Sequence, residues 1–308
     1  MQALVTGGAG FIGSHIAQRL VRDGHTVRVL DNLSSGRREN LAEFADEVEF
    51  VQGDIRDSDV LQRLSQGCDR VFHQAAVVSV PYSVEHPQQT HDVNIQGTLN
   101  VLQAARAAGV GRVMFACSAA TYGEEPGLPK RETMAPAPCS PYGVEKITGE
   151  YYLSVFHRLY GVETVSLRYF NVFGPRQDPG SPYSGVISIF VRRALDGQTP
   201  RVYGDGEQYR DFVYVDNVVQ ANMLAATVPA AAGRCYNVGC GEQTSLNDLL
   251  RILGQLSGRS ITAEYAPPRA GDIRESLADI TRIRTELGYA PTVSVEQGLR
   301  RLLEHERG

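Results

Sequence analysis

The sequence predicts an α/β fold in which a doubly wound parallel sheet carries a smaller, interleaved C-terminal lobe. Two observations predict it. Short apolar segments alternate with amphipathic helical patterns over residues 1–171, and a glycine-rich turn follows the first apolar segment. Strands that alternate with helices form right-handed βαβ units, so we expect a parallel sheet with helices on both faces.

The predicted elements follow one another in a regular order. Apolar runs predict strands over residues 3–6, 26–30, 48–54, 69–75, 111–117 and 162–171. Amphipathic patterns between them predict helices over residues 11–22, 57–67 and about 87–108, with a further helix that opens near Ser140. Beyond Asn171 the pattern gives way to loops rich in Gly and Pro. We therefore expect residues 1–171, with a return segment at about 212–240, to form the sheet domain, and residues 172–211 and 241–308 to form the second lobe.

Composition excludes several classes of function. The chain has 308 residues and a formal net charge of -5, without a polybasic block, so nucleic acid is not an expected partner. No apolar run approaches the roughly 20 residues that span a bilayer, and the first residues do not resemble a signal peptide. Five cysteines show no metal-binding or CxxC spacing, and no carboxylates surround His73 or His91 at ligand spacing. These features predict a cytoplasmic protein with reduced thiols and no metal site.

A glycine-rich segment, "VTGGAGFIGSHIAQRL", follows the first predicted strand. Gly7, Gly10 and Gly13 would allow a tight turn and close approach of a pyrophosphate to the free N–H groups of a helix N-terminus. Asp31 ends the second strand about 20 residues later, where a carboxylate accepts hydrogen bonds from an adenosine ribose. The pattern predicts a Rossmann domain that binds NAD(H), because a 2′-phosphate would meet like charge at Asp31. Arg37 and Arg38 leave NADP(H) open, since a loop arginine could offset that acid.

A second motif, "SPYGVEK", predicts chemistry at the same sheet edge. Ser140 is a good N-cap and Pro141 a good first helical residue, so Tyr142 and Lys146 lie at i and i+4 on one helix face. We expect the cation, the helix N-terminus and a bound nicotinamide ring to lower the pKa of Tyr142, which would make the phenolate a base for a substrate hydroxyl. Ser118 ends the fifth predicted strand, where its hydroxyl could bind the same substrate oxygen.

Together, "TGGAGFIG", a serine at the end of the fifth strand and Tyr-x-x-x-Lys resemble the extended short-chain dehydrogenase/reductase superfamily. "GDGEQYRDFVYVDNVVQA" and "YNVGCGEQTS" are similar to its nucleotide-sugar branch. The resemblance implies a Rossmann domain with a C-terminal substrate lobe, in a homodimer formed through two helices per subunit. It places Asp54 and Ile55 beside the adenine of NAD. It also implies further cofactor contacts at Phe11, Ile12, Asn32, Ala75, Asn94, Tyr169 and the Tyr142–Lys146 pair, with Lys146 on the nicotinamide ribose.

The same resemblance implies a substrate site and narrows the reaction. Dehydratases and decarboxylases of this branch carry an acid after the strand-end serine, whereas this chain has Ala119, Ala120 and Thr121. What remains resembles the NAD-dependent 4-epimerases of UDP-hexoses, with a UDP-glucuronate 4-epimerase, another dehydratase or a reductase as alternatives. In that branch, Asn171 corresponds to a residue that holds the sugar diphosphate, Arg210 and Arg269 to the arginines that clamp the phosphates, and Asp272 to the carboxylate that binds the uridine ribose.

Two further positions concern the substrate: Ser276 suggests which sugars fit, and Tyr209 departs from the pattern of the branch. Ser276 corresponds to the residue that flanks the C2 substituent of the sugar, and a small side chain there leaves room for the acetamido group of UDP-GlcNAc or UDP-GalNAc. Tyr209 departs from the Thr or Val that is usual before the first arginine, so the shape of that loop stays open.

Overall fold

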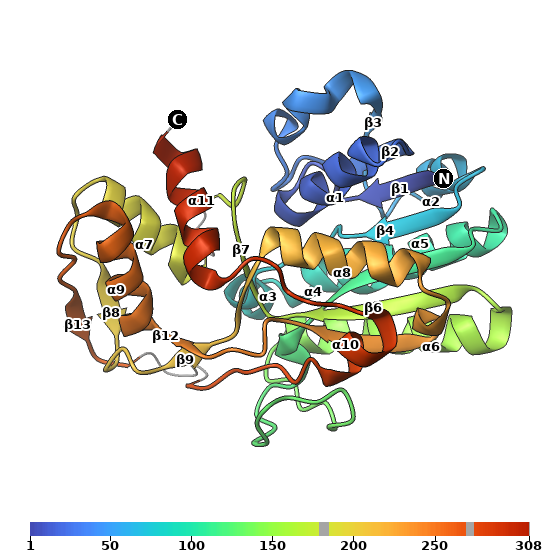
Figure 1. The fold of residues 1–308 in the computed structure, drawn as a ribbon. Helices are drawn as coiled ribbons and strands as arrows, with labels where there is room; N and C mark the ends of the chain where they lie inside the picture. Colours follow the sequence, from blue (N-terminus) through green and yellow to red (C-terminus); the bar gives the residue numbers. More distant parts are fainter. Residues whose placement is uncertain (179–184, 269–273, 308) are drawn as a thin grey trace.

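The computed structural model describes residues 1–178, 185–268 and 274–307. Its centre is a seven-stranded sheet in the order β3-β2-β1-β4-β5-β6-β11, with every neighbouring pair parallel (Figure 1). The strands are β1 (Gln2–Thr6), β2 (Thr26–Asp31), β3 (Val48–Gln52), β4 (Arg70–His73), β5 (Arg112–Ser118), β6 (Glu163–Tyr169) and β11 (Arg234–Val238). The six strands predicted in the first 171 residues are confirmed, and β11 falls within the predicted return segment.

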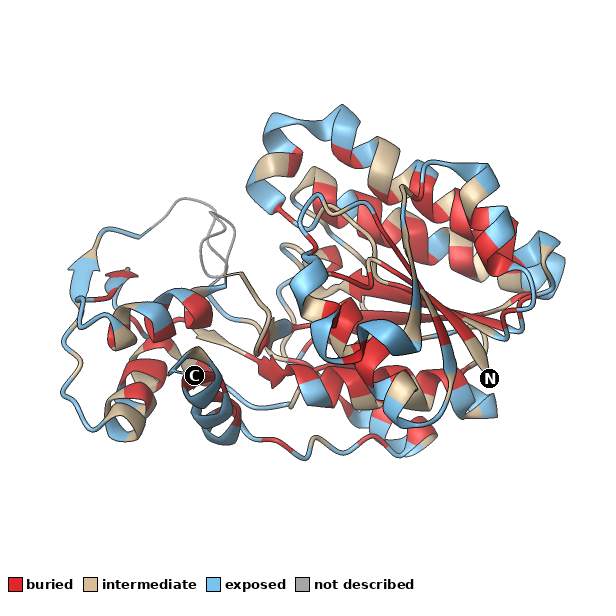
Figure 2. Ribbon diagram, turned by 90° about the horizontal axis from the view of Figure 1, so that it is seen from above, coloured by how far each residue is buried: buried red, intermediate tan, exposed pale blue. Residues whose placement is uncertain are grey.

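Helices cover both faces of this sheet. One face packs on α1 (Phe11–Arg22) and α8 (Val215–Thr227), and the other on α2 (Ser58–Ser65), α5 (Thr98–Ala107) and α6 (Pro141–Tyr160). Successive residues of one strand serve opposite faces, so Val5 belongs to the first core and Leu4 to the second. Figure 2 shows the buried strands between these helices, as expected for a parallel sheet.

The strand register brings the functional ends of the strands to one edge. Thr6 at the end of β1 pairs with Leu30 on one side and His73 on the other, and Ser118 pairs with Tyr169. The strand order reverses between β1 and β4, which is where open α/β sheets form their ligand crevice.

The helical region after residue 79 differs from the single helix that was predicted from about 87. It consists of α3 (Val80–Glu85), α4 (Pro87–His91), a π-helical turn η2 (Asp92–Gly97) and α5. The buried Asn94 lies in the π turn and hydrogen-bonds to residues distant in sequence, Val77 and Glu145. Short-range periodicity carries no sign of such long-range bonds, which is why the sequence pattern reads as one continuous helix.

The described residues of the second lobe form three two-stranded sheets and a core of their own. The strand pairs are β7 (Asn171–Phe173) with β10 (Phe212–Tyr214), β9 (Tyr209–Arg210) with β12 (Thr244–Ser245), and β8 (Arg201–Tyr203) with β13 (Glu264–Ala266). Helices α7 (Val186–Leu195), α9 (Leu246–Ser257) and α11 (Val295–Arg307) supply much of its core.

Helix α10 (Thr281–Leu287) packs back on β11, and its Ile283 belongs to the core of the large sheet. The predicted lobe segment 241–308 thus contains a stretch that packs on the other body, and the domain division stays a prediction. Short 3-10 segments complete the described structure at Arg38–Glu47, Ala119–Thr121 and Pro229–Ala231. In the described part of the chain, no helix combines the length and the apolar character needed to cross a membrane.

Candidate active site

The turn between β1 and α1 is built so tightly that side chains are excluded from it. Gly7 has a φ of +69°, and a Cβ on Gly7 would lie 2.6 Å from the backbone nitrogen of Ala75. A Cβ on Gly13 would lie 2.1 Å from the carbonyl oxygen of Gly7. Gly10 is the N-cap of α1, so no capping side chain blocks the first N–H groups of the helix, which begins with Phe11. These N–H groups can therefore bind an anion such as a pyrophosphate.

Asp31 is fixed beside this turn by its own backbone contacts. Its two carboxylate oxygens accept hydrogen bonds from the N–H of Ala9, at 2.9 Å, and of Leu33, at 2.8 Å. The two arginines that left NADP(H) open are engaged elsewhere. Arg37 forms an ion pair with Asp178, and the guanidinium of Arg38 stacks on the Phe50 ring. Asp31 is thus the charged group tied to the glycine turn, which fits an unphosphorylated ribose.

The residues expected beside the adenine form a second cluster of polar side chains, at the ends of β2 and β3. The Asn32 amide donates to Asp54 at 2.9 Å, and the Arg56 guanidinium pairs with the same carboxylate at 2.8 Å. Hydrogen bonding to Arg56 lowers the pKa of Asp54 to about 2, so this group is ionised at neutral pH. Ile55 is buried and contacts Gly97, where an added Cβ would collide with it.

The helix that carries Tyr142 and Lys146 begins as predicted. The Ser140 hydroxyl accepts a hydrogen bond from the N–H of Gly143, and Pro141 is the first helical residue. Lys146 Nζ lies 5.7 Å from the centre of the Tyr142 ring and donates to the carbonyl oxygen of Ala116 at 2.9 Å. The predicted pair therefore does share one helix face, directed at β5.

In the protein without cofactor, the pKa of Tyr142 is shifted upwards, and the lowered pKa expected beside a bound nicotinamide ring stays a prediction. Burial raises the pKa of Tyr142 above its ordinary value, although its hydrogen bond with Ser118 opposes this rise. Burial also lowers the pKa of Lys146 to about 8. Both shifts have the same physical cause, because a buried group favours its uncharged form. In the free protein Tyr142 is consequently a neutral phenol in contact with a serine hydroxyl.

Other predicted residues of this edge lie at adjoining strand ends. The Ser118 hydroxyl accepts from the N–H of Ala120 at 3.1 Å, in addition to its contact with Tyr142. Tyr169, at the end of β6, donates to the Gln74 amide oxygen at 3.3 Å and accepts from Asn222 at 2.8 Å. Gln74 precedes Ala75, the residue against the glycine turn. The edge of the sheet thus joins the cradle to the Ser–Tyr–Lys group.

Sequence reasoning missed several polar residues that support this group. Ser83 accepts a hydrogen bond from the N–H of Tyr142 at 3.1 Å, and Glu145 binds Asn94 at 2.6 Å. Glu145 lies at i+3 from Tyr142, in a stripe of helix α6 that is buried. A carboxylate at a position expected to be apolar is the signal that could have identified it.

Backbone hydrogen bonds link the segments that carry three predicted substrate residues, Asn171, Arg210 and Ser276. Arg210 donates to the carbonyl oxygens of Tyr209, at 2.9 Å, and Arg274, at 3.1 Å. The N–H of Ser276 donates to the Tyr209 carbonyl at 3.2 Å, so Ser276 lies along the strand that carries Arg210. Asn171 opens β7, and its N–H donates to the Asp211 carbonyl at 3.1 Å. The other two predicted substrate residues, Arg269 and Asp272, lie outside the described residues.

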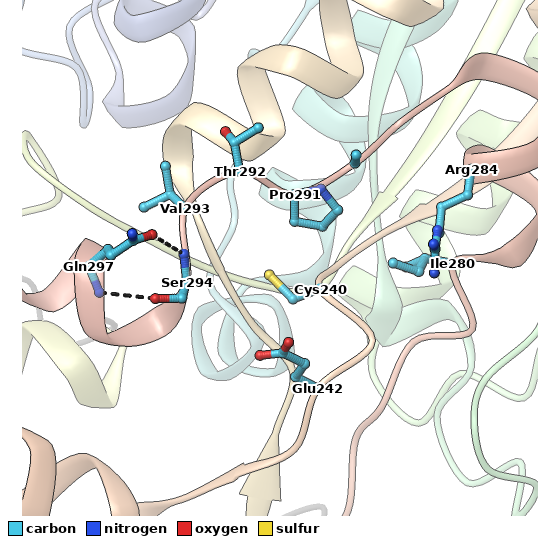
Figure 3. Close-up of a pocket in the computed structure, with 10 residues that line it drawn as sticks. Cys240, Glu242, Ile280, Arg284, Pro291, Thr292, Val293, Ser294 and Gln297 are labelled. Carbon is cyan, nitrogen blue, oxygen red and sulfur yellow. Dashed lines mark hydrogen bonds between the residues drawn. The ribbon is translucent and has the colours of Figure 1, made fainter.

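A cavity of about 360 Å³ lies elsewhere, at the segment that joins α10 to α11 (Figure 3). None of the predicted catalytic, cofactor or substrate residues that the structure describes lines it. Ser294 and Gln297 face each other there and form the reciprocal hydrogen bonds that cap α11. Its remaining lining residues are Cys240, Glu242, Ile280, Arg284, Ala290, Pro291, Thr292 and Val293. Among the residues that the structure describes, no cluster of three or more His, Cys, Asp or Glu could hold a metal ion.

Known proteins resemble this chain over its whole length. A UDP-glucose 4-epimerase from Mycolicibacterium smegmatis is 43% identical over 311 residues, which cover 100% of this chain and 99% of the relative. A crystal structure of the Thermotoga maritima UDP-glucose 4-epimerase with UDP-glucose is 42% identical, with a TM-score of 0.94 and coverage of 100% of this chain and 99% of that one. A UDP-N-acetylglucosamine 4-epimerase from Methanobrevibacter ruminantium M1, in complex with UDP-N-acetylmuramic acid, is 40% identical, with a TM-score of 0.95 and coverage of 99% and 98%.

The family resemblance extends to the sheet domain and its ligand edge. The model of the NAD dependent epimerase/dehydratase family matches residues 3–239, which include the glycine turn, Asp31, Ser118 and the Tyr142–Lys146 pair. The chain belongs to the NAD dependent epimerase/dehydratase family.

Proposed function

We propose that the protein is an NAD-dependent 4-epimerase that interconverts UDP-glucose and UDP-galactose, and that also accepts UDP-GlcNAc and UDP-GalNAc. The observation that carries this proposal is the contact between Ser118 and Tyr142, beside Lys146, at the sheet edge that begins with the glycine turn. The full-length similarity to two kinds of UDP-sugar 4-epimerase supports the same reaction.

The residues of the sheet edge fit a dinucleotide. Gly7 and Gly13 leave the space that a pyrophosphate needs, the open N-terminus of α1 supplies N–H donors, and Asp31 is positioned to accept from a ribose. Bound NAD supplies a reversible hydride acceptor and, when oxidised, a positive charge that would favour ionisation of Tyr142.

The chain's own residues carry the proton chemistry. As the phenolate that oxidised NAD would favour, Tyr142 takes the proton from the 4′-hydroxyl as C4′ is oxidised; the resulting phenol returns that proton when the ketone is reduced from the opposite face. Ser118 holds the same oxygen in line with the phenol. Lys146 provides a cation close to the Tyr142 ring, which stabilises the phenolate that must be present before the proton is taken and that is regenerated when the proton is returned. The pKa of Lys146, about 8, keeps most of this cation present at neutral pH.

The second lobe anchors the nucleotide and leaves the sugar free to turn. Arg210, together with Arg269, is proposed to hold the diphosphate through charge-assisted hydrogen bonds, which are the strong ones in proteins. Asn171 and Asp272 complete the proposed hold on the diphosphate and the uridine ribose. A chain with a net charge of -5 binds a dianion by concentrating guanidinium groups at the site.

The residues after Ser118 favour epimerisation over dehydration. Thr121 is buried and donates its hydroxyl hydrogen to the Ser118 carbonyl at 2.9 Å, while Ala119 and Ala120 carry no acid. Elimination of water needs a proton donor at this position in the related dehydratases. The small side chain of Ser276 leaves room for the acetamido group of an N-acetylhexosamine. The alternative substrate is UDP-glucuronate, which would make the protein a UDP-glucuronate 4-epimerase.

We also propose a cytoplasmic homodimer formed through two helices per subunit. Large apolar side chains are exposed on two neighbouring helices, at Val84 on α3 and at Tyr151 and Leu159 on α6. All five cysteines are free thiols, which fits a reducing compartment.

Purified protein, assayed without added reductant, tests the proposal. UDP-glucose, UDP-GlcNAc and UDP-glucuronate are supplied separately, and the products are separated by chromatography and identified by NMR. Formation of UDP-galactose and UDP-GalNAc supports the proposal. Turnover of UDP-glucuronate alone would favour the alternative sugar, and a 4-keto-6-deoxy product would show a dehydratase.

A further inference from the structure

A buried carboxylate lies between the two residues of the proposed catalytic pair. Glu145 precedes Lys146 on α6 and is 3% exposed. A buried carboxylate raises the free energy of the folded state unless hydrogen bonds or charges compensate its lost hydration. The proton chemistry at Tyr142 gives Glu145 no task, so its burial requires another explanation.

Both oxygens of this carboxylate bind side chains of a different helical segment. Oε1 accepts from the Thr90 hydroxyl at 2.6 Å, and Oε2 accepts from the Asn94 amide at 2.6 Å. Thr90 and Asn94 are themselves buried, at the end of α4 and in the π turn η2. Short hydrogen bonds between buried groups hold the carboxylate in one position.

The hydrogen bonds continue from Asn94 towards the glycine turn. Its amide nitrogen also donates to the Val77 carbonyl at 2.9 Å, and its oxygen accepts from the Val77 N–H at 2.8 Å. Val77 lies in the loop after β4, two residues beyond Ala75, whose backbone fills the space where Gly7 would carry a Cβ. A continuous series of contacts therefore connects helix α6 to the dinucleotide cradle.

We propose that Glu145 is a positioning residue that fixes the Tyr142–Lys146 pair relative to the dinucleotide cradle, through Asn94 and the loop after β4. The inference rests on the proposed function, because it concerns the distance between the catalytic pair and the bound nicotinamide. The same contacts assign Asn94 a bracing role, since both atoms of its amide are occupied by Val77 and Glu145.

The charge of Glu145 has a second, measurable effect. It raises the pKa values of both Tyr142 and Lys146, whereas burial lowers that of Lys146 to about 8. The other titratable groups that face Lys146 are the thiol of Cys117 on β5 and the imidazole of His73 on β4. Removal of the charge at position 145 should lower both pKa values, so both limbs of the pH–rate profile should move to lower pH.

Two variants separate the position of the side chain from its charge. In Glu145→Gln, the amide oxygen can accept from Asn94, and the amide nitrogen can donate to the Thr90 hydroxyl, whose single hydrogen can then turn to the Pro87 carbonyl oxygen, 3.2 Å away. Glu145→Ala removes both bonds. Calorimetric titration of protein stripped of cofactor should give a Kd for NAD within about threefold of wild type for Glu145→Gln, and at least about tenfold higher for Glu145→Ala. Both limbs of the pH–rate profile should shift to lower pH in Glu145→Gln.

Glu150→Gln is the matched control, because Glu150 is a buried carboxylate of the same helix that binds Arg168 and Ser166. It should lower the Tm and leave the Kd for NAD and the pH limbs unchanged. If Glu145→Ala does not fold, Thr90→Val removes the hydrogen bond to Oε1 without changing a residue expected to contact the cofactor, and should raise the Kd for NAD by about threefold or more. Wild-type NAD affinity in the folded Glu145→Ala variant, or in Thr90→Val where Glu145→Ala does not fold, would overturn the inference. Failure of the proposed epimerase reaction would appear instead as absent turnover in the wild type, with these Kd differences intact.

Discussion

The two halves of the molecule hold their proposed ligands by different means. At the sheet edge, backbone N–H groups and glycines set the binding surface, and an added Cβ on Gly13 would lie 2.1 Å from a carbonyl oxygen. In the second lobe, the proposed anchor is the long side chain of Arg210, on a strand of two residues. A rigid cradle suits a cofactor that must return hydride to the same carbon. Anchoring through side chains holds the nucleotide while leaving the sugar free to turn.

The cores of the two halves also differ, in the length and the burial of their strands. The central strands of the large sheet are covered on both faces and are almost entirely buried, as in β5 (Arg112–Ser118), whereas the edge strand β3 is only partly buried. Strands of the lobe have two or three residues, and Tyr265 on β13 is exposed. We therefore expect substitutions at the sheet edge to act on turnover and cofactor affinity, and substitutions in the lobe to act on substrate affinity.

The largest effect should come from Tyr142→Phe. Loss of the phenolic hydroxyl removes the proposed base, so kcat should fall by roughly 10²–10⁴, while NAD affinity is retained. Steady-state assays with UDP-glucose and calorimetric titration with NAD check both parts. Tyr122→Phe is the control, because this buried tyrosine donates to Asn237 at 2.7 Å. It should cost about 1 kcal/mol of stability and leave kcat near wild type. A Tyr142→Phe enzyme with near-wild-type kcat would remove Tyr142 from the mechanism.

Substitutions in the lobe should change KM rather than kcat. Arg210→Ala should raise the KM for UDP-glucose by about 10- to 150-fold with little change in kcat, because a hydrogen bond to a charged group contributes about 1.5–3 kcal/mol. Arg210→Lys should recover part of this loss, since it keeps the charge but not the planar fork. Arg251→Ala, on the exposed surface of α9, should leave KM unchanged. An Arg210→Ala enzyme with a normal KM and a reduced kcat would contradict the division between the two halves.

Affinity for the cofactor should depend on the space at Gly13. In Gly13→Ala, the new methyl group would collide with the Gly7 carbonyl, and a forced fit of this kind costs about 1–3 kcal/mol. The Kd for NAD should therefore rise by about 5- to 150-fold. Gly24→Ala tests strain alone, because Gly24 has a φ of +77° and nothing within 4 Å of its Cβ position. That variant should bind NAD normally with a slightly lower Tm. Equal NAD affinity in both variants would argue against a sterically closed cradle.

The smallest expected effect is on the pH dependence of folding stability, and it comes from two buried titratable groups, one in each half. Burial lowers the pKa of His73 in the sheet from 6.5 to about 3, so its contribution to stability is present above pH 6.5 and is lost as the pH falls towards 3. Burial raises the pKa of Asp211 at the junction of the lobe from 3.8 to about 6, so its contribution is present below pH 3.8 and is lost as the pH rises through 6.

Urea unfolding at pH 4.5 and pH 6 measures both contributions. Relative to wild type, His73→Gln should lose less stability on acidification, and Asp211→Asn should lose more, each by on the order of 1 kcal/mol. Equal pH dependence in all three proteins would mean that neither group titrates differently on folding.

Much of the sheet domain could be predicted because its signals are local. Apolar runs mark the strands, and the Ser140–Pro141 cap fixes the start of α6, as the structure confirms. The glycine turn needs only neighbouring residues, and its fit is visible in the contacts of Gly7 and Gly13.

What the sequence could not predict depends on contacts between distant residues. The π turn around Asn94 is bonded to Glu145, a residue 51 positions away. The raised pKa of Tyr142 arises from burial, which the spacing of Tyr142 and Lys146 does not reveal. In the lobe, Ser276 lies beside the Arg210 strand through its bond to Tyr209, again over a long separation. The roles of these lobe residues remain predictions.

Epimerisation of UDP-glucose in D₂O, followed by NMR, tests the central claim most directly. Hydrogen that leaves C4′ as hydride and returns to the same carbon does not exchange with solvent. We expect UDP-galactose that retains protium at C4′, formed without added NADH and without loss of water. Deuterium at C4′, or a 4-keto-6-deoxy product, would contradict the proposed mechanism.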